Sequence, residues 1–199
     1  MGISTSPERN DIVSAHHADT KGASMNYSIV FSSQTGNTEL VARRIRKTLG
    51  EEGCTYFGTP ADAPAGTTHA DVVFVGSWTD KGTASADVLA FLGTLDHARV
   101  FLFGTCGYGE SEEYFNAILS RIREELPDSC EVAGSFMCQG KMGEAVLDRY
   151  RTMLAEAEAG SPEAKRAAML IKNFEVARSH PNTDDLRALD VALRAAGLA

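Results

Sequence analysis

The sequence predicts an α/β fold in which five parallel β-strands form a doubly wound sheet with helices on both faces. Short apolar runs alternate with amphipathic segments along most of the chain, which is the pattern of repeated βαβ units. Residues 71–76 are apolar at almost every position, as expected for a central strand covered on both faces. Polar loops that contain glycine follow the first, third and fourth runs, and parallel strands would bring these loops to one crevice.

The individual elements follow from this alternation in chain order. The predicted strands cover residues 27–31, 54–57, 71–76, 99–103 and 130–137. The predicted helices cover residues 39–49, 84–95, 112–126, 144–157, 162–179 and 183–196. Gly50 and Pro127 suit helix ends. Ser161 and either Asn182 or Thr183 suit the N-caps of the last two helices, which are additional to the five alternating units.

Residues 1–24 differ from the rest of the chain. They are largely polar, show no sustained period, and end directly before Met25 and the first predicted strand. We expect them to form a disordered extension or to reflect an upstream start. We expect residues 25–199 to form one domain.

Composition and charge exclude several classes of protein. The 199 residues are 43% hydrophobic and 23% charged, with no apolar run long enough to span a membrane and no signal-peptide pattern. We therefore expect a cytoplasmic protein without a membrane partner. The net charge of −8 argues against nucleic-acid binding and favours a basic protein partner. The four cysteines lack C-x-x-C spacing, so we expect reduced thiols and no metal site.

The loop at residues 32–39 has the composition of an anion-binding nest. Nearly all of its residues are small or carry a hydroxyl or amide, and Gly36 permits a tight path that brings backbone N–H groups together beside a helix N-terminus. The loop lacks the lysine of a triphosphate loop and the glycine spacing of a dinucleotide loop. We therefore expect one monophosphate held by neutral groups. The alternative is that Ser33, Thr35 and Thr38 only cap the helix, with Thr38 as N-cap.

Two later loops at strand ends each carry an aromatic residue beside glycines. Trp78 follows the third predicted strand and Tyr108 follows the fourth, so the two rings could enclose the flat ring system of a flavin mononucleotide (FMN). Glycines 82, 107 and 109 would allow the backbone to approach that ring closely. Cys106 lies in the same region, either as a redox-active thiol or as a small buried side chain.

These motifs resemble those of the flavodoxin family. Residues 33–39, Ser-Gln-Thr-Gly-Asn-Thr-Glu, are similar to its phosphate-loop signature S/T-x-T-G-N-T-E, and residues 76–78 resemble its tryptophan loop. Residues 113–115 resemble the Glu-Tyr-Phe that opens its fourth helix. The resemblance covers residues 25–154 and implies strand order 2-1-3-4-5 with tightly but non-covalently bound FMN. It places the phosphate on Ser33, Thr35, Asn37 and Thr38, and the ring against Trp78.

The candidate cofactor-binding set combines the three loops, and no catalytic residue is predicted. It comprises Ser33, Gln34, Thr35, Gly36, Asn37, Thr38, Ser77, Trp78, Thr79, Asp80, Gly82, Thr105, Cys106, Gly107, Tyr108 and Gly109. Two positions depart from the family pattern. Gln34 replaces a common hydroxyl, and Glu112 stands where long flavodoxins place an aromatic, so the outer stacking residue is either Tyr108 or absent.

The chain continues to residue 199, well past the end of this resemblance. This tail, together with residues 136–141, resembles a small branch of flavodoxin-like proteins from gut and anaerobic bacteria that are encoded beside bilirubin reductase. The resemblance implies a bilirubin or bilin reductase as the redox partner. The residues themselves do not identify that partner.

The favoured function is a low-potential electron carrier, active as a monomer or weak dimer. Acidic side chains near the ring would disfavour the negative charge of a reduced flavin and would dock a basic reductase and an acceptor oxidoreductase transiently. The nearest charges in sequence are Asp80, Glu110, Glu112 and Glu113, with Lys81 opposing them.

Two alternatives remain open from the sequence. One is an NAD(P)H-dependent FMN or quinone reductase on the same fold. Its dinucleotide would be held by cations of the tail, namely Lys165, Arg166, Lys172 and Arg178. The other is a binding module without redox chemistry, in which the nest holds a different phosphate or nothing.

Overall fold

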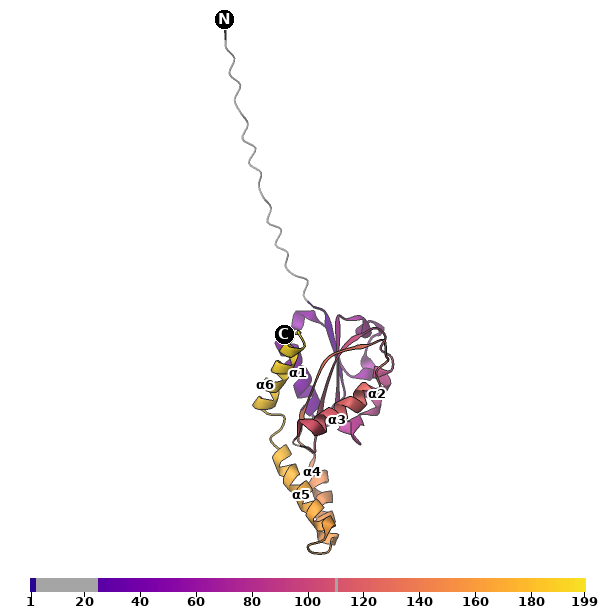
Figure 1. The fold of residues 1–199 in the computed structure, drawn as a ribbon, viewed down its shortest axis with the longest axis vertical. Helices are drawn as coiled ribbons and strands as arrows, with labels where there is room; N and C mark the ends of the chain where they lie inside the picture. The colour runs from indigo at the N-terminus through magenta and orange to yellow at the C-terminus, as the bar shows by residue number, and fades with distance from the viewer. Residues whose placement is uncertain (3–24, 110) are drawn as a thin grey trace.

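A five-stranded parallel sheet forms the centre of the molecule (Figure 1). The computed structural model describes residues 1–2, 25–109 and 111–199, so residues 3–24 of the predicted N-terminal extension and Glu110 lie outside the described residues. The strands occur in the order β2-β1-β3-β5-β6. Their bounds are β1 Tyr27–Phe31, β2 Cys54–Gly58, β3 Val72–Asp80, β5 Arg99–Cys106 and β6 Glu131–Gln139. This confirms the expected order 2-1-3-4-5 of the five parallel strands.

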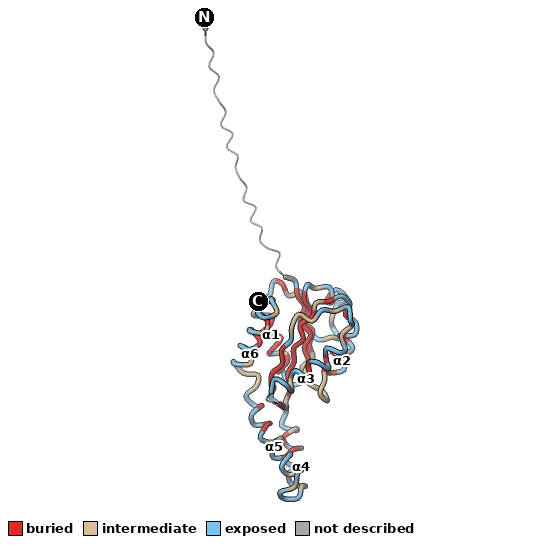
Figure 2. Tube along the Cα trace, in the orientation of Figure 1, coloured by how far each residue is buried: buried red, intermediate tan, exposed pale blue. Residues whose placement is uncertain are grey.

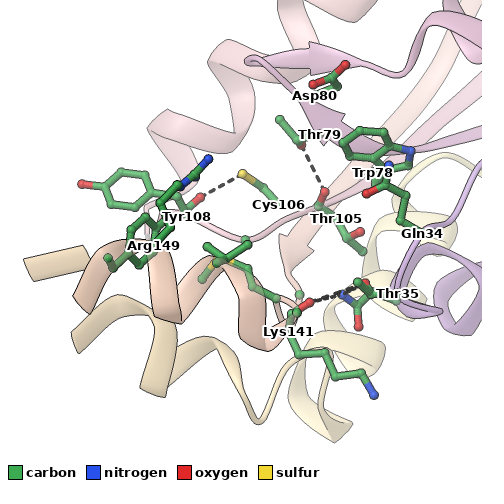
Figure 3. A pocket seen from close by; sticks show the side chains of 17 residues that line it. Gln34, Thr35, Trp78, Thr79, Asp80, Thr105, Cys106, Tyr108, Lys141 and Arg149 are labelled. Atoms are coloured by element: carbon green, nitrogen blue, oxygen red, sulfur yellow. Dashed lines mark hydrogen bonds between the residues drawn. The ribbon is translucent and has the colours of Figure 1, made fainter. Parts of the chain in front are cut away.

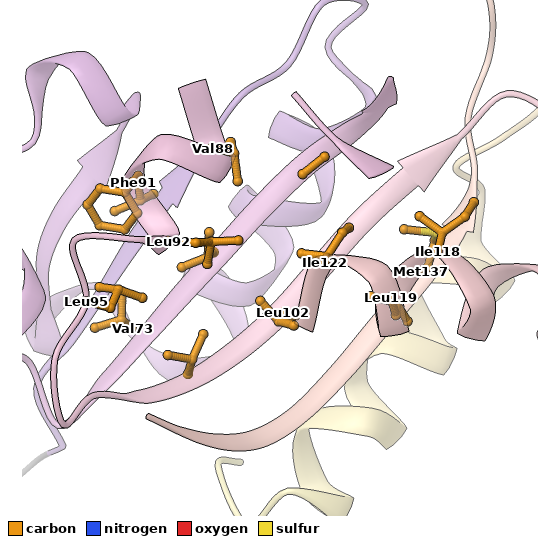
Figure 4. Packing of buried hydrophobic residues seen from close by; sticks show 14 of the residues in the cluster. Val73, Val88, Phe91, Leu92, Leu95, Leu102, Ile118, Leu119, Ile122 and Met137 are labelled. Atoms are coloured by element: carbon orange, nitrogen blue, oxygen red, sulfur yellow. The ribbon is translucent and has the colours of Figure 1, made fainter. Parts of the chain in front are cut away.

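Helices cover both faces of the sheet, as a doubly wound fold requires. The helices are α1 Asn37–Leu49, α2 Ala86–Leu92, α3 Glu112–Arg123, α4 Glu144–Glu156, α5 Pro162–Ala177 and α6 Thr183–Ala195. One hydrophobic core lies between the sheet and α2 and α3 (Figure 4), and a second lies between the sheet and α1 and α6. The central strands β1, β3 and β5 are consequently the most deeply buried part of the sheet (Figure 2).

Strand β3 is longer than its apolar run predicts, and it ends in a hairpin. The polar loop expected after residue 76 is instead a hairpin. Residues 77–80 continue β3, Lys81 and Gly82 form the turn, and the short antiparallel strand β4 Thr83–Ala84 pairs with the end of β3. Ser77 is buried in this extension, where its hydroxyl bonds to the Ser85 hydroxyl at 3.1 Å. Lys81 and Gly82 both have positive φ, which matches the two-residue turns that suit a twisted hairpin. A buried strand can therefore carry polar residues that an apolar pattern misses.

The ends of several other elements differ from the predicted ends. Helix α1 begins at Asn37, two residues before the predicted start, because Gly36 is its N-cap. Helix α2 begins only at Ala86, since Ala84 pairs in β4. Strands β2, β5 and β6 extend to residues 58, 106 and 139, and α3 ends at residue 123 instead of 126. The N-cap predictions for Ser161 and Asn182 are confirmed, because both side chains accept backbone N–H groups of the helices that follow.

The helices after β6 divide into two groups. Helices α4 and α5 pack against each other as a hairpin that extends beyond the carboxyl ends of the strands (Figure 1). The chain then returns, and α6 packs against α1 and β6. Asp190 of α6 accepts a hydrogen bond from Arg44 Nε at 3.0 Å and another from the Thr48 hydroxyl at 3.0 Å. Helix α6 thus completes the sheet covering, while the α4–α5 hairpin faces the edge of the sheet where the loops gather.

Candidate cofactor site

A cavity of about 420 Å³ lies at the carboxyl edge of the sheet (Figure 3). Ten of its lining residues belong to the predicted set, namely Gln34, Thr35, Asn37, Trp78, Thr79, Asp80, Thr105, Cys106, Gly107 and Tyr108. Seven were not predicted, namely Gly140, Lys141, Met142, Gly143, Val146, Arg149 and Tyr150. The first group comes from the ends of β1, β3 and β5. The second comes from the segment between β6 and the middle of α4, which we call the helical wall (residues 140–150).

One end of the cavity is formed by the nest loop (residues 32–37) at the start of α1. Gly36 has φ of 82° and serves as N-cap without any side-chain cap. The Ser33 hydroxyl accepts the N–H of Glu39 at 3.3 Å, so one donor of the first turn is satisfied from upstream. The exposed Thr35 hydroxyl lies beside this helix N-terminus, where backbone N–H groups and the helix dipole favour an anion.

Thr38 is not the helix N-cap that one of the two sequence interpretations made it. The alternative in which Thr38 is the N-cap is wrong, because the residue lies inside α1 and Gly36 is the cap. Its side chain is fully buried, and its hydroxyl lies 3.0 Å from the Thr105 hydroxyl at the end of β5. Thr38 therefore fastens the nest loop to the sheet beneath the cavity.

Asn37 joins the nest loop to the helical wall. Its amide nitrogen donates to the Thr35 hydroxyl at 2.8 Å and to the Lys141 carbonyl at 2.8 Å. The side chain is nearly inaccessible, and a Cβ on Gly140 would come within 2.7 Å of its amide nitrogen. The close approach of the two walls therefore depends on the glycine at position 140.

The other end of the cavity has an aromatic residue on each side. Figure 3 shows Trp78 from β3 on one side of the cavity and Tyr108 from the ring loop (residues 107–109) on the other. Tyr108 is 37% exposed and contacts Tyr114 edge-on, with ring centroids 5.6 Å apart. A flat ring system could lie between the two aromatic side chains.

Hydrogen bonds to the carbonyls of β5 and the ring loop hold the floor of this end. The Thr79 hydroxyl donates to the Thr105 carbonyl at 3.1 Å, and the Cys106 thiol donates to the Tyr108 carbonyl at 2.9 Å. Burial raises the pKa of the Cys106 thiol, which favours the protonated form that makes this bond. All four cysteines are free, as predicted, and Cys106 is a buried thiol.

The remaining predicted residues lie around the cavity without lining it. Ser33 and Gly36 belong to the nest loop, and Thr38 is buried directly after it at the start of α1. Ser77 is buried in β3, where its hydroxyl bonds to the Ser85 hydroxyl. The Gly82 carbonyl accepts a hydrogen bond from Arg121 at 2.9 Å. Gly109 lines a neighbouring cleft with Tyr114. Their assignment to cofactor binding stays a prediction.

The charges of the cavity wall come largely from residues that the sequence analysis missed. Asp80 lines the cavity from β3, whereas Lys141 and Arg149 line it from the helical wall. Figure 3 shows the Lys141 side chain directed away from the cavity and the Arg149 side chain beside Tyr108. The position of residues 138–143 after the fifth strand could have indicated a contribution from this loop. No local signal marks Arg149 or Tyr150.

Comparison with known proteins identifies the family. The family model of the flavodoxin domain matches residues 28–194, which include the six α-helices except the last residue of α6 and the five parallel strands except the first residue of β1. The chain belongs to the flavodoxin family. The match extends through the α4–α5 hairpin of this flavodoxin domain into α6.

The relatives of this flavodoxin domain include two bacterial proteins that share one name. The flavodoxin-like domain-containing protein BilS of Clostridium symbiosum is 40% identical over 178 residues, covering 82% of this chain and 92% of the relative. The protein of that name from Clostridioides difficile is 31% identical over 159 residues, covering 79% and 88%. A solved short-chain flavodoxin associated with a non-canonical PDU bacterial microcompartment is 17% identical, covering 78% and 99%, with a TM-score of 0.46.

Two further findings concern the described part of this flavodoxin domain. Within it, no helix is both long and apolar enough to cross a lipid bilayer. Across residues 1–2, 25–109 and 111–199, no three His, Cys, Asp or Glu side chains gather as metal ligands would.

Proposed function

We propose that this flavodoxin domain binds FMN non-covalently and carries electrons between other proteins. The observation that carries the proposal is the cavity itself, which has hydroxyl and amide groups at a helix N-terminus at one end and an aromatic residue on each side at the other. Its volume of about 420 Å³ is within the range of small-molecule sites. The donor set fits a phosphate at one end and a flat ring at the other.

Each group of residues would have a separate task. Thr35 and the first N–H groups of α1 would hold the phosphate, with Ser33 and Thr38 keeping the nest loop in place. Trp78 and Tyr108 would enclose the ring and exclude water from its faces. When bound, FMN would supply the redox centre that exchanges electrons with partner proteins.

The charge of the chain supports a low reduction potential. The net charge of −8 opposes the addition of an electron anywhere in the molecule, and Asp80 adds a carboxylate to the cavity wall. The exposed Glu112 and Glu113 begin α3, directly after the ring loop. We propose that this acidic rim docks a basic reductase transiently, with rates that fall as ionic strength rises.

We further propose a bilirubin or bilin reductase as the acceptor oxidoreductase. The support is the resemblance of the tail and residues 136–141 to proteins encoded beside such a reductase. The tail (residues 155–199) comprises the end of α4, together with α5 and α6. Stopped-flow mixing of the reduced protein with the acceptor would test this step, and absence of electron transfer would contradict it.

Stepwise reduction of the FMN-loaded protein tests the electron-carrier function. We expect purified protein to bind one FMN, and reduction with limiting dithionite to pass through a long-lived one-electron stage visible in the absorbance spectrum. Direct two-electron reduction without that stage would contradict the proposal. A protein that stays colourless after addition of FMN would instead support the binding module without redox chemistry.

A second candidate function is an NAD(P)H-dependent flavin or quinone reductase, and one observation favours it. Two clefts of about 480 and 450 Å³ share Tyr108 with the cofactor cavity, and Lys172 and Arg166 of α5 line them. Cations beside an aromatic ring could hold a phosphorylated nicotinamide dinucleotide. If NADPH bleached the bound flavin at a catalytic rate, and the K172Q and R166Q variants lost that rate, this function would replace the first.

A further inference from the structure

The α4–α5 hairpin supplies one side of the cofactor cavity. Val146, Arg149 and Tyr150 of α4 line the cavity. Figure 3 shows Arg149 on the side of the cavity away from Thr35 and Trp78. The three α4 residues follow the end of β6 by several residues and reach the site because α4 begins at the carboxyl edge of the sheet, from which the hairpin extends (Figure 1). The hairpin is therefore a structural part of the site.

Buried amide side chains fix the hairpin to the ring loop. Asn173 of α5 donates to the Gly107 carbonyl at 2.9 Å, and Gln139 at the end of β6 donates to the same carbonyl at 3.3 Å. Gln139 also donates to the Asn173 side-chain oxygen at 3.0 Å. Both amides are about 95% buried, and a buried network of this kind holds its members in one arrangement. Met142 packs so closely on Gly107 that a Cβ there would meet its Cγ at 2.5 Å.

The attached hairpin places one arginine of α4, Arg149, at the end of the cavity that Trp78 and Tyr108 line. Arg149 lines the cavity, and its guanidinium also lies over the Tyr150 ring, 5.7 Å from the centroid. Arg151 lies two residues further along the same helix, is not among the lining residues, and contacts Asp148 at 3.4 Å. The two arginines carry the same charge on the same helix and differ in their position relative to the site.

We propose that Arg149 is a potential-tuning residue that raises the reduction potential of the bound cofactor. The inference rests on the proposed function, because it requires FMN in the cavity. Each electron taken from an external donor adds negative charge to the cavity unless a proton follows. A cation that lines the cavity lies closer to that charge than a cation elsewhere on the chain does, and it therefore stabilises the charge more. Arg149 therefore opposes, at short range, the lowering effect of the chain's net charge of −8.

A matched pair of variants, R149Q and R151Q, separates position from net charge. We expect R149Q to lower the equilibrium constant for one-electron reduction about tenfold in at least one step, which is about 59 mV. R151Q removes the same charge from the same helix and should change that constant less than twofold. R149K keeps the charge on a flexible stem and should return the potential most of the way to wild type. The potentials are measured by equilibration with reference dyes, at low and at high salt.

The possible results test the tuning role of Arg149 separately from the proposed electron-carrier function. Equal shifts in R149Q and R151Q, or no shift in either, would overturn the tuning role of Arg149 while leaving the electron carrier intact. Failure of the wild-type protein to bind FMN would contradict the proposed function first. Arg149 is exposed, so R149Q should fold, and far-ultraviolet circular dichroism with thermal unfolding checks this. A potential restored by R149K excludes a purely structural cause.

Discussion

The nest loop and the helical wall form opposite sides of one cavity and differ in chemistry and origin. The nest loop is uncharged and lies on a turn between β1 and α1. The helical wall carries Lys141 and Arg149 and belongs to a hairpin added beyond the sheet. If the proposals above hold, cofactor binding and cofactor tuning reside in separate parts of the chain. Substitutions in the nest loop should change affinity, and those in the helical wall should change the potential.

The largest expected effect comes from Asn37, which connects the two walls. N37L removes the donors to Thr35 and to the Lys141 carbonyl and leaves that carbonyl without this partner. We expect unfolding free energy to fall by about 2 kcal/mol. FMN affinity should fall about 100-fold, since the walls would no longer be held together. Calorimetric titration and chemical unfolding measure the two quantities. The N116L variant makes the same exchange at an exposed position on α3 and should leave both within error of wild type.

A smaller effect is expected from the two aromatic residues, and it should fall on affinity. Trp78 belongs to a strand paired on both sides, whereas Tyr108 is 37% exposed on the ring loop. We expect W78L to weaken FMN binding about tenfold and Y108L about threefold, in line with aromatic contacts of about 0.5–1.5 kcal/mol. Flavin fluorescence measures both variants. Trp78 is the only tryptophan, so quenching of its emission reports FMN binding in Y108L and wild type. A larger loss in Y108L would contradict this ranking.

The sequence alone predicted the parts of the site that lie next to strand ends. The nest loop and the two aromatic residues each follow an apolar run directly, so their place at one edge follows from the parallel sheet. The polar end of β3 was missed because Ser77 is buried through hydrogen bonds, which no hydrophobic pattern records. The burial of Thr38 could not be predicted for the same reason, because its hydroxyl bonds to that of Thr105, 67 positions away.

The helical wall could not be predicted from the sequence, for a different reason. The direction of α4 depends on its packing against α5 and on the contact of Gln139 with Asn173, which are 34 positions apart. Asn173 belongs to no recognisable motif, and the resemblance of residues 136–141 assigned no contact to Gln139. The sequence correctly predicted that helices follow the fifth strand, but it could not distinguish the pair that extends past the sheet from α6, which covers it. Long-range contacts between polar side chains decide that difference.

The attachment of the hairpin gives a third prediction. N173L removes one of the two amide donors to the Gly107 carbonyl, while Gln139 remains. We expect a loss of about 1 kcal/mol in the stability of the α4–α5 hairpin relative to the core. Amide hydrogen exchange should then accelerate in α4, α5 and the ring loop, and stay unchanged in β1 and β3. Uniform acceleration across the sheet would mean that hairpin and core unfold as one unit.

The smallest effect is expected where α6 meets α1, because this contact belongs to the fold and not to the site. Hydrogen bonds from Arg44 hold the pKa of the Asp190 carboxyl below its ordinary value. Since the folded-state pKa is lowered, the stabilisation is present above the unfolded-state pKa of about 4 and is lost as pH falls through the folded-state value. We expect D190N to lower unfolding free energy by about 1 kcal/mol at neutral pH. The difference from wild type should shrink below about pH 4.

Urea unfolding of wild type and D190N between neutral and acidic pH measures this dependence, and FMN titration of the same samples completes the comparison. D190N should keep wild-type FMN affinity and wild-type potentials, because Asp190 lies against α1 and outside the cavity lining. A potential shift in D190N comparable to that of R149Q would show that charge anywhere in the C-terminal helices alters the cofactor. That result would remove the distinction between a tail helix that covers the sheet and one that lines the site.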